Sequence, residues 1–442
     1  MDTVPVRAIV GMLAAMPQPP SAVSRDEPVI RDRGDACPGA LRLHAADDGH
    51  LARVRIPGGA LTAHQALLLA SAADRFGDGH LELTSRGNVQ LRGLADGCGA
   101  GLAALLDAAG LLPAPGHERV RNIVATPTCQ DVLPWVRELD RLLCANARVT
   151  ALSGRFLFAL DDGRGDVAAL DPDVTVLGRP GGRALVRLGA AAGAVAVAAQ
   201  DAPRAALLAA EYFLDAADAA GTRAWRVAEL PAGHALDDAE FTARLAAAGI
   251  GAARAPEVDW PYTAPPRPWG RGPGPRGDLC VLPPLGRMTT GQWRVLAGVA
   301  GHGDGLRITP WRTVVLPDAP LRGPVDGPAL LEEAGLVVAP DSPWQSVTSC
   351  TGRPGCAKSL ADVRADARAL VDRARGPLPV HWSGCERRCG HPRGTQWVDV
   401  LATQDGYRLS VGGHTLPHRP DLAAALTAAR ETTASPQSPK TQ

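Results

Sequence analysis

An internal repeat constrains this chain more than any other feature, because its fold has to accommodate two copies of one segment. The first copy, residues 55–93, reads RIPGGALTAHQALLLASAADRFGDGHLELTSRGNVQLRG, and the second, residues 282–318, reads LPPLGRMTTGQWRVLAGVAGHGDGLRITPWRTVVLPD. Residues 61–65 align with residues 288–292, and after one deletion Arg86 aligns with Arg312. The repeat therefore divides the protein into two comparable halves.

Each copy is expected to fold as a strand, a turn, a helix and further strand pieces. Residues 54–56 form a short strand that a Pro-Gly-Gly turn ends. Thr62 is the expected N-cap of an apolar helix that runs through Ala73, and residues 80–93 give two strand pieces around a Gly-Asn turn. Because such a segment cannot bury both faces alone, the two copies are expected to pack about a pseudo-two-fold axis as one α+β unit.

Mixed α/β segments follow each copy, and a stretch rich in proline and glycine joins the two halves. The expected order along the chain is a disordered N-terminal segment (1–32), a first half-domain (33–112), an α/β domain (113–255), a linker (256–277), a second half-domain (278–338), a second α/β domain (339–430) and a disordered tail (431–442).

Charge and hydropathy exclude several classes of protein. The formal net charge is 0, from 46 Lys and Arg against 46 Asp and Glu, so bulk charge favours no nucleic-acid partner. No apolar run reaches the roughly 18 residues of a membrane-spanning helix, so no membrane partner is expected. The apolar stretch 8–16 lacks a clear cleavage site, which favours a loosely assigned start over a signal peptide. Nine cysteines, an odd count, favour a reducing compartment, so we expect a cytoplasmic protein.

Four of the nine cysteines form two pairs in the second half. Cys350 and Cys356 make a C-x5-C motif, and Cys385 and Cys389 make a C-x3-C motif. Four thiolates can hold a tetrahedral zinc ion or an iron–sulfur cluster. Structural zinc prefers tighter loops within each pair, whereas a cubane tolerates wider ones because its irons spread over a larger body. The spacing favours an iron–sulfur cluster, with four unrelated buried cysteines as the alternative.

The surroundings of the cysteine motifs differ between the halves. The matching loop of the first half, residues 122–131, lacks the quartet, so only the second half is expected to carry a cluster. A weaker echo of the repeat relates residues 152–156 (LSGRF) to residues 382–386 (WSGCE). A helix is expected after Cys356, with its positive N-terminus toward an anionic cluster and an apolar face made of Leu360, Val363, Ala367, Leu370 and Val371.

Arginines show the opposite asymmetry. Arg55 precedes the Pro-Gly-Gly turn of the first copy, where the second copy has Leu282, and Arg92 aligns with Asp318. Alternate residues of a strand share one face, so Gln90 and Arg92 are expected to project together. Converging arginines make bidentate contacts with carboxylates, and the alternative for each is a solvated surface charge. The candidate binding residues for a carboxylate-bearing ligand are Arg55, Arg86, Gln90, Arg92, Arg121, Asn122 and Arg155.

The segments RVRIPGGALTAHQ, LTSRGNVQLRG and RNIVATP, together with the cysteine quartet, resemble the nitrite and sulfite reductase superfamily over residues 37–425. The resemblance implies an α+β fold in which two ferredoxin-like half-domains pair about a pseudo-two-fold axis, beside two α/β domains. It also implies a [4Fe–4S] cluster on the paired cysteines, of which the last, Cys389, bridges to a sirohaem iron in the reductases. The family arginines that hold tetrapyrrole carboxylates or the bound anion match Arg55, Arg86, Arg121 and Arg155.

Within the superfamily, the chain resembles the precorrin-3B synthases of aerobic cobalamin biosynthesis most. The segment RGDACPG at residues 33–39 opens the similar region as in that family, and the chain is short for a sulfite reductase. Leu157 replaces a lysine that helps the reductases bind and protonate their anion, and its loss counts against a reduction that consumes many protons. The resemblance implies O2-dependent hydroxylation of precorrin-3A at C-20, with lactone formation from the ring A acetate.

The same resemblance implies further cofactors and partners. The cluster would relay electrons to a non-haem iron, and an external ferredoxin or NAD(P)H-dependent reductase would supply them. His381 and His391 flank the cluster loop as candidate iron ligands, with a structural role as the alternative; the sequence assigns no catalytic residue. Two other functions stay open at this point: a sirohaem-dependent nitrite or sulfite reductase, and a non-enzymatic iron–sulfur or electron-transfer protein.

Overall fold

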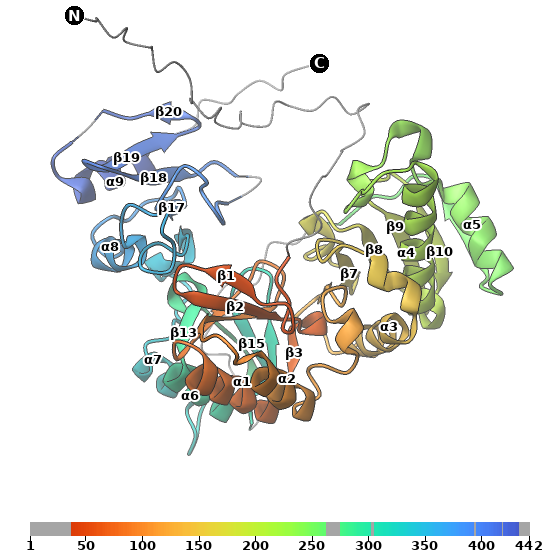
Figure 1. Ribbon diagram of the computed structural model, residues 1–442, viewed down its shortest axis with the longest axis horizontal. Coiled ribbons are helices and arrows are strands. Elements are labelled where there is room, and N and C mark those ends of the chain that lie inside the picture. Colours follow the sequence, from red (N-terminus) through yellow and green to blue (C-terminus); the bar gives the residue numbers. More distant parts are fainter. Residues whose placement is uncertain (1–36, 262–274, 302–304, 393–394, 418, 433–442) are drawn as a thin grey trace, which may run out of the picture.

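The computed structural model describes residues 37–261, 275–301, 305–392, 395–417 and 419–432. The expected disordered segment 1–32 lies outside these residues, as do most of the expected linker and tail. Among the described residues, no helix combines the length and apolar character that crossing a membrane requires. Both copies of the repeat build a central unit, and Figure 1 shows one α/β domain toward either side of it.

Two antiparallel sheets form the central unit, and each contains a strand from the other copy. The first sheet has the order β1–β2–β5–β4–β13, and the second has the order β12–β15–β14–β3. Strand β13 of the second copy pairs with β4, and β3 of the first copy pairs with β14. The strands are β1 (His44–Ala46), β2 (Gly49–Val54), β3 (Ala60–Leu61), β4 (His80–Leu83), β5 (Val89–Leu94), β12 (Arg276–Val281), β13 (Arg287–Thr289), β14 (Leu306–Ile308) and β15 (Val314–Pro320).

Helices α1 (Ala63–Phe76) and α6 (Thr290–Ala300), one from each copy, pack against each other. Trp293 of α6 is fully buried, and its Nε1 donates a 2.7 Å hydrogen bond to the Ala66 carbonyl oxygen of α1. One hydrophobic core contains residues of both copies, as the expected pairing requires. Helices α2 (Gly99–Ala108) and α7 (Gly327–Glu333) follow the last strand of each copy.

The same capping box starts both central helices. Thr62 accepts a hydrogen bond from the Gln65 N–H, and Thr289 accepts one from the Gln292 N–H, while each glutamine side chain bonds back to its N-cap backbone. A cap of this kind contributes about 1 kcal/mol. The two matching caps confirm the alignment of residues 61–65 with residues 288–292.

The hairpin that follows each helix also closes in the same way. The N–H of Thr84 donates to the Asn88 carbonyl oxygen at 3.0 Å, and the N–H of Thr309 donates to the Thr313 carbonyl oxygen at 2.9 Å. This correspondence fixes the register of the two hairpins. Between its helix and its hairpin, the second copy is therefore two residues shorter than the first. The alignment predicted from the sequence has only one deletion there.

This register shows that the alignment of Arg86 with Arg312 is wrong by one position. Arg86 corresponds to Trp311, and Arg312 corresponds to Gly87. Gly87 and Arg312 both have a left-handed backbone, with φ of 65° and 59°. A glycine adopts this geometry freely, whereas a residue with a Cβ does not. The second copy thus carries a long cationic side chain where the first copy has none.

Two further left-handed glycines of the first copy have side chains in the second. Gly93, with φ of 66°, corresponds to Asp318, with φ of 47°. The expected match of Arg92 with Asp318 is therefore wrong as well. Gly58, with φ of 61°, corresponds to Leu285, with φ of 59°. The second copy has kept the backbone of all three positions while replacing the glycine.

Two α/β domains flank the central unit. The first has a six-stranded sheet of order β11–β10–β9–β8–β7–β6, and the second has a five-stranded sheet of order β16–β17–β18–β19–β20. Strands β6–β7–β8 and β16–β17–β18 are parallel. The elements are β6 (Ile123–Ala125), α3 (Leu133–Ala145), β7 (Phe158–Asp161), β8 (Val174–Arg179), β9 (Arg183–Leu188), β10 (Ala194–Ala198), α4 (Ala202–Ala219), α5 (Asp238–Ala247), β11 (Ala252–Ala255), β16 (Val347–Ser349), α8 (Val363–Leu370), β17 (Val380–Ser383), β18 (Val398–Thr403), β19 (Gly406–Val411), β20 (His414–Thr415) and α9 (Leu422–Arg430).

The shared strand order shows that the similarity between residues 152–156 (LSGRF) and residues 382–386 (WSGCE) is not part of the repeat. Phe158 begins β7 and Val380 begins β17, the second strand of each parallel set. Residues 152–156 precede β7, whereas residues 382–386 overlap the end of β17. The two segments therefore lie at opposite ends of equivalent strands, and their similarity is not a structural correspondence.

The helix expected after Cys356 begins later than predicted. Helix α8 begins at Val363 and has Asp362 as its N-cap, whose side chain accepts a hydrogen bond from an N–H of the first turn. Val363 and Ala367 are buried as expected, but Leu360 is 43% exposed and precedes the helix. The acidic cap already compensates the positive end of the helix, so the expected attraction to an anionic cluster is weakened.

Candidate active site

The two cysteine motifs meet at one cavity of about 630 Å³ between the second α/β domain and the first copy of the repeat. One motif follows β16 and the other follows β17, so the parallel strands bring both loops to the same edge of the sheet. Among the described residues, no three His, Cys, Asp or Glu side chains converge on a single metal ion. The thiols line the wall of a shared space, and they belong to Cys350, Cys356, Cys385 and Cys389.

Backbone N–H groups face the first of these sulfurs. The N–H of Gly384 donates to Cys350 Sγ at 3.2 Å. Burial raises the pKa of the Cys350 thiol, the N–H groups of Gly384 and Gly352 lower it, and the neighbouring Cys385 and Cys389 raise it. Thiols bind metals as thiolates, and amide hydrogen bonds stabilise sulfur in that form. The four-thiol lining and the amide bond therefore fit a [4Fe–4S] cluster.

The first α/β domain has a hydroxyl where the second has a thiol. Thr126 follows β6 as Cys350 follows β16. Thr126 Oγ1 accepts a 3.2 Å hydrogen bond from the Asp162 N–H, just as Cys350 Sγ accepts one from the Gly384 N–H. Thr126 Oγ1 also donates to Asp166 Oδ1 at 2.9 Å. The same local framework thus carries a ligand-type sulfur in one domain and a hydrogen-bonded threonine in the other.

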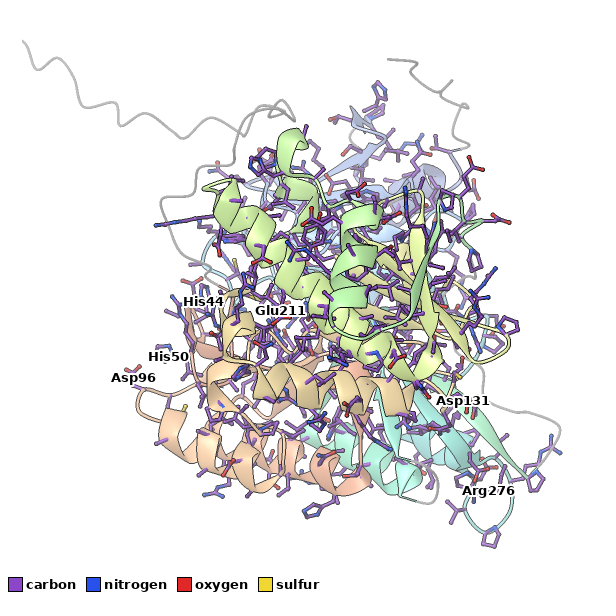
Figure 2. All side chains as sticks on the ribbon, turned by 90° about the vertical axis from the view of Figure 1, so that its right-hand side faces the viewer. His44, His50, Asp96, Asp131, Glu211 and Arg276 are labelled. Carbon is purple, nitrogen blue, oxygen red and sulfur yellow. The ribbon has the colours of Figure 1, made fainter. Side chains whose placement is uncertain are left out.

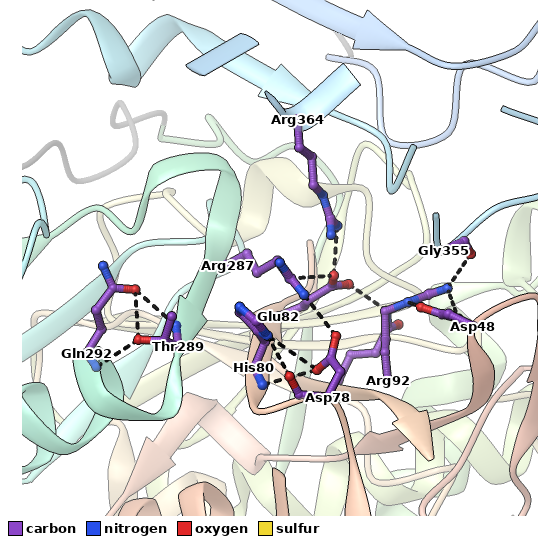
Figure 3. Close-up of polar contacts among 11 residues, drawn as sticks. Asp48, Asp78, His80, Glu82, Arg92, Arg287, Thr289, Gln292, Gly355 and Arg364 are labelled. Carbon is purple, nitrogen blue, oxygen red and sulfur yellow. Dashed lines mark hydrogen bonds and ion pairs between the residues drawn. The ribbon is translucent and has the colours of Figure 1, made fainter. Parts of the chain in front are cut away.

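A clamp from the first copy holds the cysteine loop (Figure 3). Arg92 of β5 donates to both carboxylate oxygens of Asp48 at 2.9 and 2.8 Å, and its Nη2 also donates to the Gly355 carbonyl oxygen at 2.7 Å. The neighbouring Asp47 accepts a 2.6 Å hydrogen bond from the Ala357 N–H. These four hydrogen bonds attach the β1–β2 hairpin and β5 to the C-x5-C loop, so the first half of the chain positions Cys350 and Cys356.

A buried carboxylate next to this clamp joins three regions of the molecule. Arg364 of α8 lies 2.7 Å from Glu82 Oε1, and Arg287 of the second copy lies 3.5 Å from the same atom (Figure 3). Gln90 donates to Glu82 Oε2 at 3.0 Å and accepts a 3.0 Å hydrogen bond from Arg53 Nη2. Gln90 therefore belongs to the polar network that docks the second α/β domain.

The outer rim of the cysteine cavity is open to solvent. Cys389 is exposed, and His44, which Figure 2 labels on the side of the molecule, lines the rim from β1. Lys358 and Arg387 are exposed and line the cavity as well. The cysteine cavity thus opens beside two cationic side chains.

A second cavity, of about 700 Å³, adjoins the first, and Cys389 and Arg387 line both. Both copies of the repeat and both α/β domains contribute to its wall. It combines cations with large apolar surfaces, as a site for a flat ligand with several carboxylates requires. We call it the arginine cavity; its lining includes Arg86, Arg226, Arg312, Arg387, Arg388, Leu157, Leu285, Trp311 and Trp344.

Positive charge in the arginine cavity is only partly compensated. Burial, together with the nearby Arg226 and Arg55, lowers the pKa of Arg86 to about 10. Arg226 is held by the buried carboxylate of Asp173, with 2.5 Å between Nε and Oδ2. Burial raises the pKa of Asp173 to about 6. An anionic ligand would relieve the repulsion among these cations.

The structure brings four of the predicted binding residues to the two cavities or directly behind them. Arg86 lines the arginine cavity, and Arg92 lines the cysteine cavity. Arg55, which is 3% exposed, lies behind Arg86: both donate to the carbonyl oxygen of Gly154, at 3.4 and 3.1 Å. Gln90 belongs to the network beside Arg92, as the expected shared strand face requires.

The other three predicted residues lie apart from the arginine cavity. Arg121 makes two 2.7 Å hydrogen bonds with Asp140 and lines a third cavity. Asn122 is fully buried and donates to a backbone carbonyl at 3.0 Å. Arg155 is exposed, with its guanidinium 4.6 Å from the centre of the Trp225 ring. Their contacts are those of residues that stabilise the fold.

Three arginines outside the predicted set also line the arginine cavity, namely Arg226, Arg312 and Arg387. Arg387 lies inside the C-x3-C motif, so its place beside the cysteines follows from the motif. Arg312 could have been found from the corrected register, which shows an arginine where the first copy has Gly87. Arg226 comes from a loop after α4, and only the tertiary fold brings it to the cavity.

The two candidate iron-ligand histidines have structural partners. Nδ1 of the fully buried His381 lies 2.9 Å from Thr348 Oγ1. Burial, with smaller contributions from Arg312 and His391, lowers the pKa of His381 to about 3, so the ring is neutral at physiological pH. The Trp397 ring lies between the two histidines, stacked on His391 at 5.4 Å and edge-on to His381 at 5.6 Å. His381 Nε2 is buried without a hydrogen-bond partner among the described residues and His391 lines the arginine cavity, so a ligand role for either histidine stays a prediction.

Left-handed backbone geometry gathers at the arginine cavity. Non-glycine residues with positive φ are uncommon and typically occur where a site requires them, at about 1–3 kcal/mol each. Of the five such residues in the described part of the chain, four line this cavity, namely Asp171, Leu285, Arg312 and Arg388. The unusual backbone positions thus coincide with the cavity that the cations and aromatic residues define.

Comparison with known proteins agrees with this geometry. The family model of the nitrite/sulfite reductase ferredoxin-like half domain matches residues 44–109 and 279–322. A precorrin-3B synthase of Sinorhizobium sp is 27% identical over 405 residues, which cover 86% of this chain and 83% of that protein. A ferredoxin–nitrite reductase of Synechococcus elongatus is 27% identical over 390 residues, which cover 78% of this chain and 74% of that protein.

A solved structure shares the fold. The structure of the Mycobacterium tuberculosis NirA protein matches with a TM-score of 0.62 and 19% identity, over 86% of this chain and 79% of that one. The half-domain model matches both copies of the repeat, and the relatives extend the similarity over both α/β domains. The chain therefore carries the nitrite/sulfite reductase ferredoxin-like half domain in both copies of its repeat, and it is similar over most of its length to a precorrin-3B synthase and to ferredoxin–nitrite reductases.

Proposed function

We propose that this oxidoreductase binds precorrin-3A in the arginine cavity and hydroxylates it at C-20 with O2, with lactone formation from the ring A acetate, as a precorrin-3B synthase. One observation carries the proposal: the arginine cavity and the cysteine cavity adjoin and share Cys389 and Arg387. A polycarboxylate substrate in the first would therefore lie next to an electron-transfer group in the second. The relative named as a precorrin-3B synthase supports this assignment.

The residues of the arginine cavity suit a tetrapyrrole with several carboxylates. Arg86 and Arg226 would bind carboxylates, and Asp173 would hold Arg226 in place. Trp311 and Trp344 offer apolar surface for the macrocycle. Leu157, which is 4% exposed, contributes an apolar wall at the position where reductases have a lysine. The cavity is therefore better suited to binding an organic macrocycle than to delivering many protons.

The four paired cysteines would hold the [4Fe–4S] cluster, which supplies one-electron transfer when bound. The reaction places one atom of O2 in the product and the other in water, so two electrons and two protons have to be supplied. An external ferredoxin or NAD(P)H-dependent reductase would deliver the electrons from the open rim beside Lys358 and Arg387. We assign no step to a mononuclear iron. The odd number of cysteines, nine, favours a reducing compartment, which supports a cytoplasmic location.

A sirohaem-dependent nitrite or sulfite reductase is the second candidate. The ferredoxin–nitrite reductase of Synechococcus elongatus is as similar in identity as the precorrin-3B synthase relative, although over less of the chain. Cys389 lines both cavities, as a cysteine between a cluster and a sirohaem would. In this reading the arginine cavity holds a permanent cofactor, whereas in the proposed reading it holds the substrate.

Purification without oxygen followed by optical spectroscopy and a single-turnover assay separates the two functions. The proposal predicts a broad cluster absorption without a Soret band, and conversion of precorrin-3A to a product one oxygen atom heavier when O2 is admitted. A Soret band with a red chlorin band, together with nitrite or sulfite reduction, would establish the reductase instead. Mass spectrometry with ¹⁸O2 identifies the source of the added atom.

A further inference from the structure

Three left-handed glycines of the first copy have side chains in the second, and two of these replacements have an evident partner. Leu285 packs against the hydrophobic core of the second α/β domain. Asp318 makes a 2.9 Å ion pair with Arg276. The third replacement, Arg312 for Gly87, lacks such a partner: within the described residues, the Arg312 guanidinium makes no hydrogen bond and no ion pair.

The surroundings of Arg312 leave space for its side chain and direct it into the arginine cavity. Its aliphatic part crosses Gly286, where an added Cβ would lie 2.8 Å from Arg312 Cδ. Its Nη2 passes Gly390, where an added Cβ would lie 3.1 Å away. Gly390 follows Cys389, and all four residues line the cavity. The guanidinium thus lies beside the cysteine that the two cavities share.

Keeping an arginine in this conformation lowers the stability of the fold. A Cβ in the left-handed region is strained, and Gly87 shows that the same hairpin closes with a glycine at this position. Burial also removes water from the cation, and no carboxylate bonds to it in return. Glu82 acts on Arg312 electrostatically but forms no ion pair with it, so the guanidinium, which lines the arginine cavity, is available to an anionic ligand.

We propose that Arg312 binds a carboxylate of the tetrapyrrole ligand next to Cys389, and that the strained backbone at this position serves ligand binding. The ligand class rests on the proposed function. Comparison of the two copies of the repeat identifies one further binding residue that the proposed function does not name. This residue is an arginine of the second copy, and it lies where the two cavities meet. Arg312 would thereby fix which edge of the macrocycle faces the cysteines.

The test compares Arg312→Gly with Arg312→Ala and with Asp318→Gly in the full-length protein. Uroporphyrin, a tetrapyrrole with eight carboxylates, serves as the binding probe by fluorescence titration at fixed salt, and thermal unfolding reports stability. Arg312→Gly should unfold at a higher temperature than wild type and bind the probe about 10-fold or more weakly, because a charge-assisted hydrogen bond is lost. Arg312→Ala should lose the same affinity without the full gain in stability. Asp318→Gly should bind as wild type does.

Three results would overturn the assignment of Arg312. A lower unfolding temperature for Arg312→Gly would show that the side chain supports the fold, and unchanged affinity in both Arg312 variants would show that it does not meet the ligand. Failure of the wild type to bind uroporphyrin would overturn it too. The protein could also bind uroporphyrin through Arg312 and yet leave precorrin-3A unconverted. That result would contradict the proposed reaction, but it would support the role of Arg312 in ligand binding.

Discussion

Arg92 donates a 2.7 Å hydrogen bond to the carbonyl oxygen of Gly355, a residue 263 positions away in the chain. The same guanidinium makes a bidentate pair with Asp48, so its orientation is fixed on two sides. The first copy of the repeat thereby holds the loop between the first two cysteines. The half of the chain without the paired cysteines thereby positions Cys350 and Cys356 of the other half.

Arg92→Ala should therefore alter the cluster as well as the fold. Removing one partner of a largely buried ion pair typically costs about 3 kcal/mol, and here it also frees the Gly355 carbonyl and loosens the cysteine loop. We expect faster cluster loss in air and a shifted midpoint in an anaerobic redox titration. Arg276→Ala is the matched control, because it removes an exposed pair with Asp318 that contributes at most about 1 kcal/mol. An unchanged midpoint in Arg92→Ala would contradict the clamp.

Cys356→Ser should abolish cluster assembly and activity together, because a serine hydroxyl is a poor substitute for a thiolate ligand. Iron and sulfide analysis of anaerobically purified protein measures the first effect, and the precorrin-3A assay measures the second. Cys98 lies outside both cavities, so Cys98→Ser should keep both the cluster and the activity. Activity that survives without a cluster would contradict the electron-transfer role.

Arg86→Ala should weaken tetrapyrrole binding about 10-fold. It should leave the cluster spectrum intact, because Arg86 lines the arginine cavity and not the cysteine cavity. Uroporphyrin titration and visible absorption give the two readings. Arg155→Ala removes an exposed arginine outside the cavity and should change neither. Equal affinities for Arg86→Ala and wild type would place the anion site elsewhere.

Ligand binding should also depend on pH near 6. Asp173 has its pKa raised to about 6 by burial, and it compensates the charge of Arg226. As pH falls through this value, Asp173 becomes neutral and the cavity gains positive charge, so uroporphyrin should bind more tightly at pH 5.5 than at pH 7.5. Asp173→Asn should bind with less pH dependence over this range. An equally steep pH profile in the variant would assign the effect to the ligand's own carboxylates.

The local features of this fold could be predicted from the sequence. Thr62 and Thr289 cap the two central helices through the same box, and the cysteine spacing brings four thiols to one cavity. Both signals depend on residues close together in the chain, where helix capping and loop geometry follow from residue type.

Features that depend on register or on distant loops could not be predicted in the same way. Arg86 aligned with Arg312 because both are arginines, but the hairpin hydrogen bonds place Trp311 there instead. Arg121 matched a family arginine, yet in this fold Asp140 binds it away from the arginine cavity. Arg226 reaches the cavity from a loop that no repeat or motif marks. One-residue differences in register redirect side chains completely, and composition does not reveal them.

The proposed function places precorrin-3A in the arginine cavity as substrate, beside the cysteine cavity. The most direct measurement is the single-turnover reaction of anaerobically purified protein with precorrin-3A, an external electron donor and ¹⁸O2, followed by mass spectrometry. We expect a product that contains one ¹⁸O atom, formed by protein without a Soret band and absent with Cys356→Ser. Unchanged precorrin-3A, with a tightly bound sirohaem in the purified protein, would contradict the proposed function.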